Sequence, residues 1–374
     1  MGTRVPAEVF PPGEFLKDEL EVRGWTQVEF AEIIGKDTRL VSEVISGKRA
    51  VTPETAMALG AALGTSPDVW MNLESQYQLS KVRSGQEEIA QKAELHSRFP
   101  VREMVKRGWI ESTKNVGVLQ QQVLAFFGMA SINDEPTACF AAKKQKYVDT
   151  PIAQIAWFCR ARSLAEAAPA AKFAQANVAT LISRLKTHLL HVEGAQSVAG
   201  ILADAGIRFV VVEALSGSKI DGACFWLDKT SPVIALSLRF DRVDNFWHTL
   251  LHEIDHIANK EGMAAPILDT DVLGTEGDSK PEFETRANEN AAENLVPRAE
   301  LDGFIARVNP MFTEDQIVGF ARRVGVHPGI VVGQLQIRRL IPWTFHRRYL
   351  EKIREYVIAS ALTDGFGHRV AGLA

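Results

Sequence analysis

The chain has 374 residues, of which 46% are hydrophobic and 24% charged, and its formal net charge is −4. This length favours two or three globular domains, each large enough to bury a core. The composition argues against a polybasic coat for nucleic acid or a disordered acidic tail. Because the sequence has no bilayer-length apolar run and no secretory signal pattern, we expect a cytoplasmic protein with no membrane partner.

The first predicted domain, residues 11–79, is a series of short helices with clear start and stop signals. Ser46-Gly47 ends one helix. The pairs Thr52-Pro53 and Ser66-Pro67 each place a capping hydroxyl before a proline at the first helical position. We therefore expect an all-α N-terminal domain.

Residues 26–46 have the pattern of a helix-turn-helix, with the small Ala31 where two helices cross and Gly35 in the tight turn between them. The side chains expected to face inward are Phe30, Ile34, Leu40, Val44 and Ile45. This arrangement turns the outer face of the second helix, and the residues flanking the motif, toward DNA. The predicted DNA-binding residues are Gln27, Thr38, Arg39, Ser42, Lys48 and Arg49.

The charge of this domain is unusual for a DNA-binding role. Residues 1–80 carry 7 Lys or Arg against 12 Asp or Glu, whereas a DNA-binding domain normally presents a basic surface. Four cations, Lys36, Arg39, Lys48 and Arg49, nevertheless cluster around the predicted second helix. We expect DNA binding of modest affinity and strong salt dependence, and a helix-turn-helix used for protein contact is the open alternative.

The second predicted region, residues 80–195, is mostly helical and rich in alanine, and none of its residues has the spacing of a catalytic or metal site. The only cysteines of the chain are Cys139, Cys159 and Cys224. They are odd in number and widely spaced, so we expect free thiols rather than a disulfide framework or a cysteine-based zinc site.

The pattern changes in the third predicted domain, residues 196–345. A short helix at 197–205 is followed by strand candidates at 207–212, 222–227 and 232–238 and by a helix at 241–259. This order predicts a small α+β core whose last helix carries the chemistry. Residues 346–374 are expected to form a basic C-terminal helix and tail.

The last helix of this core contains His252-Glu253-Ile254-Asp255-His256, which is the HExxH pattern. Histidines four residues apart lie on one helix face, about 6 Å apart along the axis, so both imidazoles can bind one ion. Glu253 lies beside that face and can take a proton from water, which makes it the predicted catalytic base. A helix that follows strands is the context that a zincin-like metallopeptidase requires.

A third ligand is expected from the helix predicted at 281–295. Glu284 is the predicted ligand, because the small Ala287 and Ala291 on the following turns allow close packing of two helices. Glu282 is the competing candidate, and both acids could instead only favour the helix dipole at this N-terminus. Three protein ligands would leave the fourth position of a Zn²⁺ ion to water.

His248 lies one turn before His252 on the same helix. It is about 12 Å along the axis from His256, which is too far for three histidines to hold one ion. A packed or supporting role is therefore favoured over chelation by His248 and His252.

A weaker echo of the helix-turn-helix occurs near the C-terminus. Ala321, Gly325 and Val331 repeat the spacing of the first motif, and Arg338 and Arg339 follow. A packed helix pair is favoured here over a second DNA-binding element.

The stretch 236–256, with Glu284-x-x-Ala287-Asn288 and Leu295-Val296-Pro297, resembles the ImmA/IrrE family of metallo-endopeptidases. The resemblance covers roughly 196–343. It implies Zn²⁺ bound by His252, His256 and Glu284, with Glu253 as the catalytic base.

The sequence departs from that family at three positions. Asp255 stands where the family usually has glycine, and Asn290 and Asn294 replace apolar residues of the second helix. These departures bear on catalytic efficiency more than on metal binding.

Residues 26–55 and 63–73 resemble the Xre/Cro helix-turn-helix of HigA-type antitoxins, and this resemblance covers about 11–79. Members of that group bind operator DNA as dimers. The implied partners are therefore operator DNA and a second copy of the chain, with a cognate toxin as a further expected partner.

Together these patterns predict a DNA-binding regulator that carries a zinc-dependent endopeptidase, and the family implies that it cleaves a repressor or an antitoxin. The alternative is an antitoxin-like repressor whose zinc domain senses or binds without cutting a peptide. A structural zinc site would be closed by a fourth protein ligand. The sequence identifies no such ligand, and His248 is the residue to examine.

Overall fold

A computed structural model of the protein describes residues 9–136, 150–270 and 281–366. The chain divides into two compact units, Met1–Glu94 and Leu95–Ala374, and the boundary falls within helix α5 (Pro67–Arg98). The expected fold class is confirmed, because a helical N-terminal region and a helical middle region precede a region of helices and strands. No helix in the described ranges is long and apolar enough to cross a membrane.

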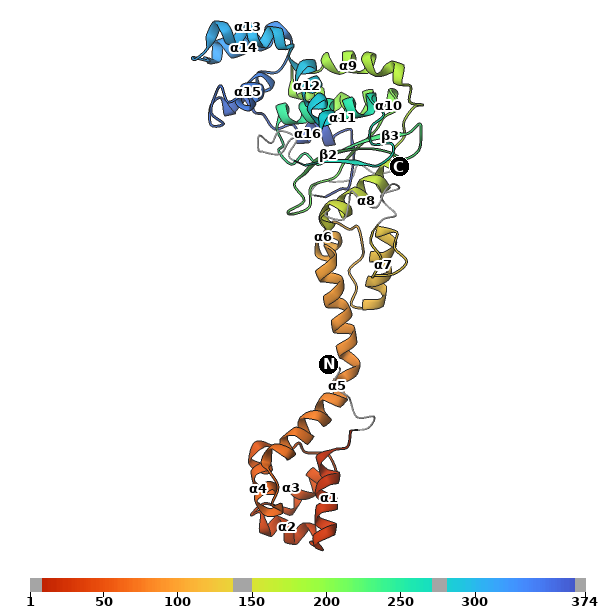
Figure 1. Ribbon diagram of the computed structural model, residues 1–374, viewed down its shortest axis with the longest axis vertical. Coiled ribbons are helices and arrows are strands. Elements are labelled where there is room, and N and C mark those ends of the chain that lie inside the picture. The colour runs from red at the N-terminus through yellow and green to blue at the C-terminus, as the bar shows by residue number, and fades with distance from the viewer. Residues whose placement is uncertain (1–8, 137–149, 271–280, 367–374) are drawn as a thin grey trace. The chain divides into compact units, whose positions relative to one another are not determined.

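The N-terminal unit is helical throughout its described part (Figure 1). Its helices before α5 are α1 (Pro12–Arg23), α2 (Gln27–Ile33), α3 (Thr38–Ile45) and α4 (Pro53–Leu63). A capping box starts α2: the Thr26 hydroxyl accepts from the Glu29 N–H at 3.2 Å, and the Glu29 carboxylate accepts from the Thr26 N–H at 2.8 Å. Gly35, with φ of +63°, makes the left-handed turn between α2 and α3.

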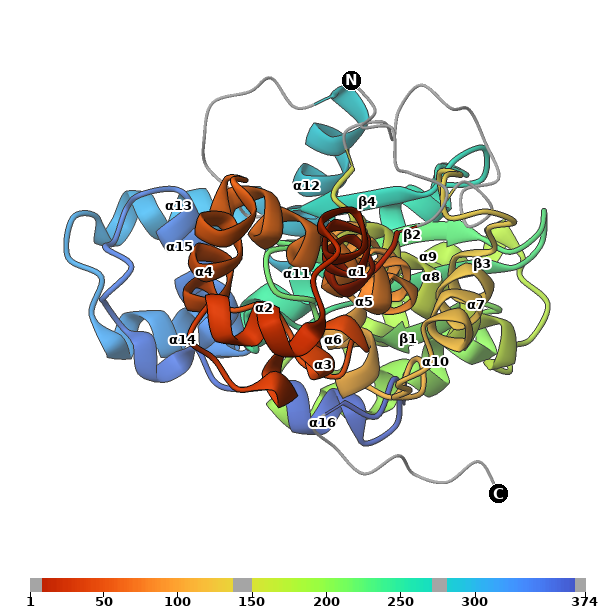
Figure 2. The same cartoon turned by 90° about the horizontal axis from the view of Figure 1, so that it is seen from below.

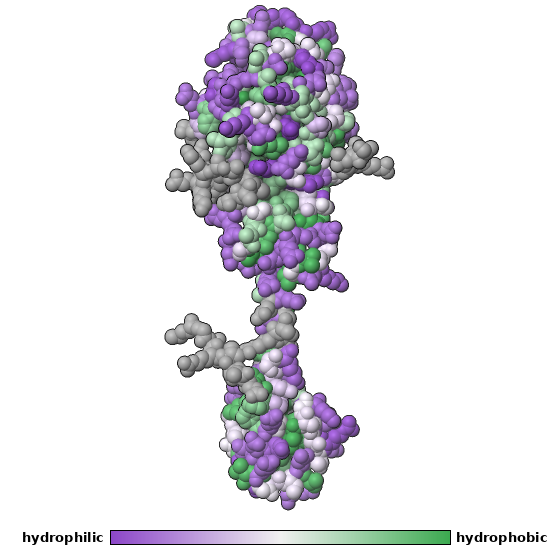
Figure 3. Space-filling view, turned by 90° about the vertical axis from the view of Figure 1, so that its right-hand side faces the viewer, coloured by the Kyte–Doolittle hydropathy of each residue, from purple (hydrophilic) through white to green (hydrophobic). Residues whose placement is uncertain are grey.

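The core of this unit contains all the residues expected to face inward and one more. Phe30 and Val44 are buried, and Ile34, Leu40 and Ile45 are partly buried and pack against them. The additional buried residue is Val41. On the face shown in Figure 3, apolar residues of this unit are scattered among hydrophilic ones.

The C-terminal unit begins with helices that belong to the predicted middle region. They are α6 (Val101–Lys106), α7 (Val116–Phe127), α8 (Ile152–Ala167) and α9 (Val178–Lys186), with the 3-10 turns η1 (Gln175–Asn177) and η2 (Val192–Ser197). The α+β part contains α10 (Val198–Asp204), β1 (Arg208–Val211), β2 (Ile220–Trp226), β3 (Pro232–Leu236), α11 (Val243–Ala258), β4 (Ile267–Thr270) and α12 (Glu282–Leu295). It continues with α13 (Arg298–Val308), α14 (Glu314–Val324), α15 (Pro328–Ile337), η3 (Arg347–Tyr349), α16 (Arg354–Ile358) and β5 (Leu362–Thr363).

The strands form a mixed sheet in the order β4-β2-β3-β1-β5. Strand β1 is parallel to β3 and β5, whereas β2 is antiparallel to β3 and β4. The sheet therefore has two strands more than the sequence suggested. One of them, β5, comes from residues 346–374, the segment expected to be a basic helix and tail. The described part of that segment instead contains η3, α16 and β5. Its Val357 is buried in the core.

Helices cover both faces of the sheet, as Figures 1 and 2 show. On one face Cys224, Ile234 and Leu236 pack with α11 and with α9 and α10. On the other face Phe225 and Val233 pack with α6, α7 and α8. The middle region is thus a structural layer of the C-terminal unit and carries a share of its core.

The cysteines differ from the expectation of free thiols. Cys224 is a free thiol, fully buried in β2. Cys159 in α8 is disulfide-bonded, so the expectation is wrong for this residue.

Candidate metal centre

Helix α11 places its HExxH residues in the interior of the C-terminal unit. Its apolar residues, among them Leu250 and Ile254, join the core on the sheet, so the helix is held along its length. His252, Glu253 and His256 all have an exposed fraction of 0%. The Nε2 atoms of His252 and His256 lie 3.0 Å apart. The helical spacing therefore turns both imidazoles toward one point.

Helix α12 adds a carboxylate to this point. Its Ala287 and Ala291 are fully buried, as expected for two helices in close contact. The Oε2 atom of Glu284 lies 3.3 Å from Nε2 of His252, and its Oε1 atom lies 3.8 Å from Nε2 of His256. Glu282, the competing candidate, is exposed, and it does not belong to the donor group found in the described ranges.

A fourth donor, Asp269 in strand β4, was not expected from the sequence. Its Oδ2 atom lies 3.3 Å from Nε2 of His252 and 3.9 Å from Nε2 of His256. The ligand atoms of His252, His256, Asp269 and Glu284 all lie within 4.8 Å of one another. His248 is outside this group, and its ring stacks 6.4 Å from that of His252, so within the described ranges it is a packed neighbour of the cluster.

The chemistry and spacing of these donors fit a small divalent cation. Two imidazole nitrogens and two carboxylates are donors that Zn²⁺ accepts, and metal–ligand bonds of 2.0–2.1 Å put the corners of a tetrahedron about 3.3 Å apart. Five separations between donor atoms run from 3.0 to 3.9 Å, with Glu284 approaching His252 through Oε2 and His256 through Oε1. The four ligand atoms lie within 4.8 Å of one another, which is close enough for one small cation.

The electrostatics of the cluster also call for a cation. Burial alone would lower the pKa of His252, but the carboxylates of Asp269 and Glu284 outweigh it and raise this pKa to about 9. One buried carboxylate, Asp269, and one half-buried carboxylate, Glu284, thus draw positive charge onto the imidazole. A bound metal ion would satisfy the same demand with both histidines neutral.

Glu253 is fully buried beside the donor group. Neither of its carboxylate oxygens has a hydrogen-bond partner among the described residues. A Cβ atom on Gly222 in β2 would lie only 2.3 Å from Oε1 of Glu253, so the glycine makes the room for this carboxylate. Burial, together with the negative charge of Asp269, raises the pKa of Glu253 well above its ordinary value, which favours proton uptake.

A layer of polar side chains contacts the His256 ring on the side opposite its Nε2 atom. Its Nδ1 atom lies 2.7 Å from Oε2 of Glu261, and Arg286 of α12 donates to the same carboxylate oxygen at 2.7 Å. A carboxylate on Nδ1 fixes the tautomer that leaves Nε2 as the metal-facing nitrogen. This layer therefore links α12 to the orientation of a ligand on α11.

The departures from the family pattern belong to the same layer. Asp255 accepts from Nδ2 of Asn290 at 2.8 Å and from Nε of Arg286 at 3.0 Å. Asn294 donates to the backbone oxygen of Asn290 at 3.0 Å. Asp255 and Asn290 are thus hydrogen-bonded partners that join the two metal-site helices.

The predicted DNA-binding residues lie on α2, on α3 and just after α3. Among them Gln27, Arg39, Ser42, Lys48 and Arg49 are exposed and Thr38 is half-buried. Glu43 pairs with two of these cations, accepting from Nε of Arg39 at 2.8 Å and lying 3.0 Å from Nε of Arg49. The hydrogen bond from Arg39 lowers the pKa of Glu43, so this carboxylate stays charged beside the recognition helix.

The C-terminal echo of the motif has a different character. Gly325, with φ of +75°, joins α14 to α15, but the residues Gly329–Gln336 of α15 are all buried. A helix buried along this length cannot enter a DNA groove. The structure thus favours the packed helix pair.

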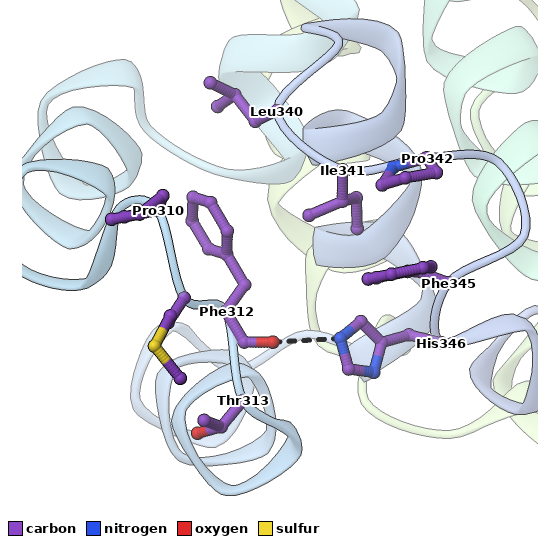
Figure 4. A pocket seen from close by; sticks show the side chains of 9 residues that line it. Pro310, Phe312, Thr313, Leu340, Ile341, Pro342, Phe345 and His346 are labelled. Atoms are coloured by element: carbon purple, nitrogen blue, oxygen red, sulfur yellow. Dashed lines mark hydrogen bonds between the residues drawn. The ribbon is translucent and has the colours of Figure 1, made fainter.

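An apolar pocket lies near this helix pair (Figure 4), and none of its lining residues belongs to the donor group. Its volume is about 340 Å³. It is lined by Pro310, Met311, Phe312, Thr313, Leu340, Ile341, Pro342, Phe345 and His346. The imidazole of His346 donates to the backbone oxygen of Phe312 at 2.9 Å, and this lining supplies no arrangement for catalysis.

Comparison with known proteins gives two family matches. Residues 16–70 match the helix-turn-helix family, and residues 204–335 match the IrrE N-terminal-like domain. The N-terminal part is 31% identical over 70 residues to the HTH-type transcriptional regulator YddM of Escherichia coli K12, covering 19% of this chain and 74% of that one. It is 38% identical over 79 residues to antitoxin HigA-1 of Vibrio cholerae, covering 21% of this chain and 74% of that one.

A solved structure of Pseudomonas aeruginosa antitoxin HigA with the higBA promoter is 27% identical, with a TM-score of 0.21, and the match covers 22% of this chain and 91% of that one. From the curated relatives and the two family matches the class follows: a helix-turn-helix regulator domain is joined to an IrrE N-terminal-like domain, which is metallopeptidase-like. Through its N-terminal domain the chain belongs to the helix-turn-helix family with HigA-like antitoxin relatives.

Proposed function

We propose that this protein is a DNA-binding regulator whose C-terminal unit is a zinc-dependent endopeptidase acting on a protein substrate, a repressor or an antitoxin. The observation that carries the proposal is the convergence of His252, His256 and Glu284 beside the unpartnered carboxylate of Glu253. The match to the IrrE N-terminal-like domain over residues 204–335 supports it.

In this proposal His252, His256 and Glu284 hold the zinc ion. Bound zinc supplies the Lewis acid that polarises a peptide carbonyl and makes water more acidic. Glu253 takes the proton of the attacking water and passes it to the nitrogen of the leaving amine. Its buried position, with room provided by Gly222, keeps this carboxylate in one place and raises its affinity for a proton. Glu261 keeps Nε2 of His256 directed at the ion.

The N-terminal unit would direct this activity to operator DNA. Helix-turn-helix proteins read half-sites as dimers, so we propose a homodimer on a two-fold operator, working in the cytoplasm. Arg39, Ser42 and Thr38 would face base edges, while Gln27, Lys48 and Arg49 would contact phosphates. Glu43 pairs with Arg39 and Arg49 and so competes with DNA for these two cations. This competition would keep the DNA affinity of the domain modest.

A second function has a specific observation in its favour. Asp269 adds a fourth protein donor to the cluster, and closed four-ligand sites are typical of structural zinc. In that case the protein is an antitoxin-like repressor with a cognate toxin as partner, and its zinc domain senses or binds without cutting peptides.

Co-expression with the repressors and antitoxins encoded beside this protein distinguishes the two functions. Wild type and Glu253→Gln are compared by mass spectrometry of those candidate substrates. The proposal expects new fragment termini with wild type alone, because glutamine keeps the shape of Glu253 but cannot accept a proton. Glu289→Gln is the matched control, since Glu289 is an exposed acid of α12. Identical fragment patterns for wild type and Glu253→Gln would reject the peptidase.

A further inference from the structure

Strand β4 carries Asp269 into the metal site from the edge of the sheet. Within the described strands β4 pairs only with β2, and the pairing shifts register between Ile220 and Gly222, next to the Gly222–Asp269 pair. A bulge of this kind turns a side chain out of the regular alternation and is common beside active sites. Asp269 lies opposite the glycine that leaves room for Glu253.

The carboxylate of Asp269 has the features of an unfilled ligand. Asp269 is 6% exposed, and its Oδ2 atom contacts the imidazole of His252, at 3.3 Å from Nε2. A buried carboxylate is costly unless it is paired or bound to a metal, and here its partner is itself a metal-type donor. Oδ2 is also the atom that lies nearest the two histidine nitrogens, at 3.3 and 3.9 Å.

The distances place Asp269 on equal terms with Glu284. Oδ2 of Asp269 lies 3.3 Å from Nε2 of His252 and 3.9 Å from Nε2 of His256. For Glu284, Oε2 lies 3.3 Å from Nε2 of His252 and Oε1 lies 3.8 Å from Nε2 of His256. A tetrahedral ion has four corners, and the two histidines with these two acids supply four donors. No coordination position of the ion would then be left for water.

We propose that Asp269 is the fourth protein ligand of the metal and that it closes the site in the resting protein. This inference rests on the proposed function, because it describes how that site is regulated. The peptidase becomes active only when the carboxylate of Asp269 leaves the ion. A water molecule then takes that coordination position, within reach of Glu253. Strand β4 is suited to such a release, because it is a four-residue edge strand held by β2 alone among the described strands.

The first test measures zinc affinity of the full chain by competition with a chromogenic chelator. Asp269→Asn keeps the size of the side chain but removes the charge, and Asp269→Ala removes the donor. We expect both to weaken zinc binding by at least about 10- to 100-fold, the loss seen when even a supporting residue of a metal site is removed. Asp204→Asn is the matched control, because Asp204 is an exposed surface acid paired with Arg184. Wild-type affinity in both Asp269 variants overturns the proposal.

The second test asks whether an outside ligand can reach the metal. The protein is loaded with Co²⁺, whose absorption spectrum reports its ligands, and titrated with azide. We expect no spectral change in wild type and in Asp204→Asn, and a saturable change in Asp269→Ala. A wild-type spectrum that responds to azide as strongly as that of Asp269→Ala shows an open corner and overturns the proposal.

These readouts separate this inference from the peptidase proposal. If wild type holds zinc through four protein ligands, but neither wild type nor Asp269→Ala cleaves any candidate substrate, the closed site stands and the peptidase fails. If wild type and Asp269→Ala cleave at equal rates with equal zinc affinity, and cleavage depends on Glu253, the peptidase stands and the role of Asp269 fails.

Discussion

The hydrogen bond between Asp255 and Asn290 predicts that two apparent departures from the family pattern depend on each other. Asp255 accepts from Asn290 at 2.8 Å and from Arg286 at 3.0 Å, which ties α11 to α12 beside the donor group. Hydrogen bonds to charged groups contribute about 1.5–3 kcal/mol when well shielded. Asn290 is exposed and the Arg286 side chain is 36% exposed, so we expect about 1–2 kcal/mol for Asp255→Ala.

Calorimetry of the metal-free full chain measures this effect without interference from zinc. For a unit of this size, a loss of 1–2 kcal/mol corresponds to a fall of about 2–3 °C in Tm of the C-terminal transition. Alanine is used because glycine in a helix adds a backbone cost of up to about 1 kcal/mol. Glu289→Ala, at an exposed position of α12, serves as the control.

The double variant Asp255→Ala/Asn290→Ala isolates the pair. We expect a coupling free energy of about 0.5–1.5 kcal/mol, because the second substitution removes a partner that the first has already lost. Effects that add to within about 0.3 kcal/mol would refute the reasoning, since independent sites behave that way. The two departures would then be unrelated substitutions.

Three further predictions concern metal and DNA. Purified protein should hold about one zinc ion per chain, as measured by elemental analysis. His252→Ala should abolish zinc binding and Glu284→Gln should weaken it. Full zinc content in both variants would show that these residues are not ligands. Arg39→Ala should relax base preference, whereas Lys48→Ala should weaken binding to all sequences and reduce the salt slope by about one; identical profiles in a binding assay would contradict these separate roles. Glu43→Gln should strengthen DNA binding at low salt, because it releases two arginines from a carboxylate; unchanged or weaker binding would contradict this reading of the ion pairs.

The parts of the structure that follow from local signals were predictable from the sequence. The left-handed turn at Gly35 was expected between two short helices and is observed there. The capping hydroxyl of Thr26 is an equally local signal, although it was not among the predicted features. The HExxH spacing likewise lies within one helix, so the meeting of His252 and His256 required no knowledge of the fold. Glu284 needed one further assumption, that the next helix packs closely through its alanines.

Long-range pairing explains what the sequence did not reveal. Asp269 reaches the cluster because β4 pairs with β2 beyond a register shift, and no spacing along the chain encodes that contact. Strand β5 joins the sheet from the far end of the chain. Asp255 and Asn290 are 35 positions apart, so the two substitutions could be recognised as partners only once α11 and α12 were placed together.

The rate of peptide cleavage by zinc-loaded Glu253→Gln tests the central claim most directly. Wild type and variant are purified, checked for equal zinc content and DNA binding, and assayed on the protein substrate identified by co-expression. We predict a fall of about 100- to 10,000-fold in rate, because one positioned proton acceptor is lost while the donor group is intact. An unchanged cleavage rate, or loss of zinc from the variant, would contradict the role of Glu253 as the base of a zinc peptidase.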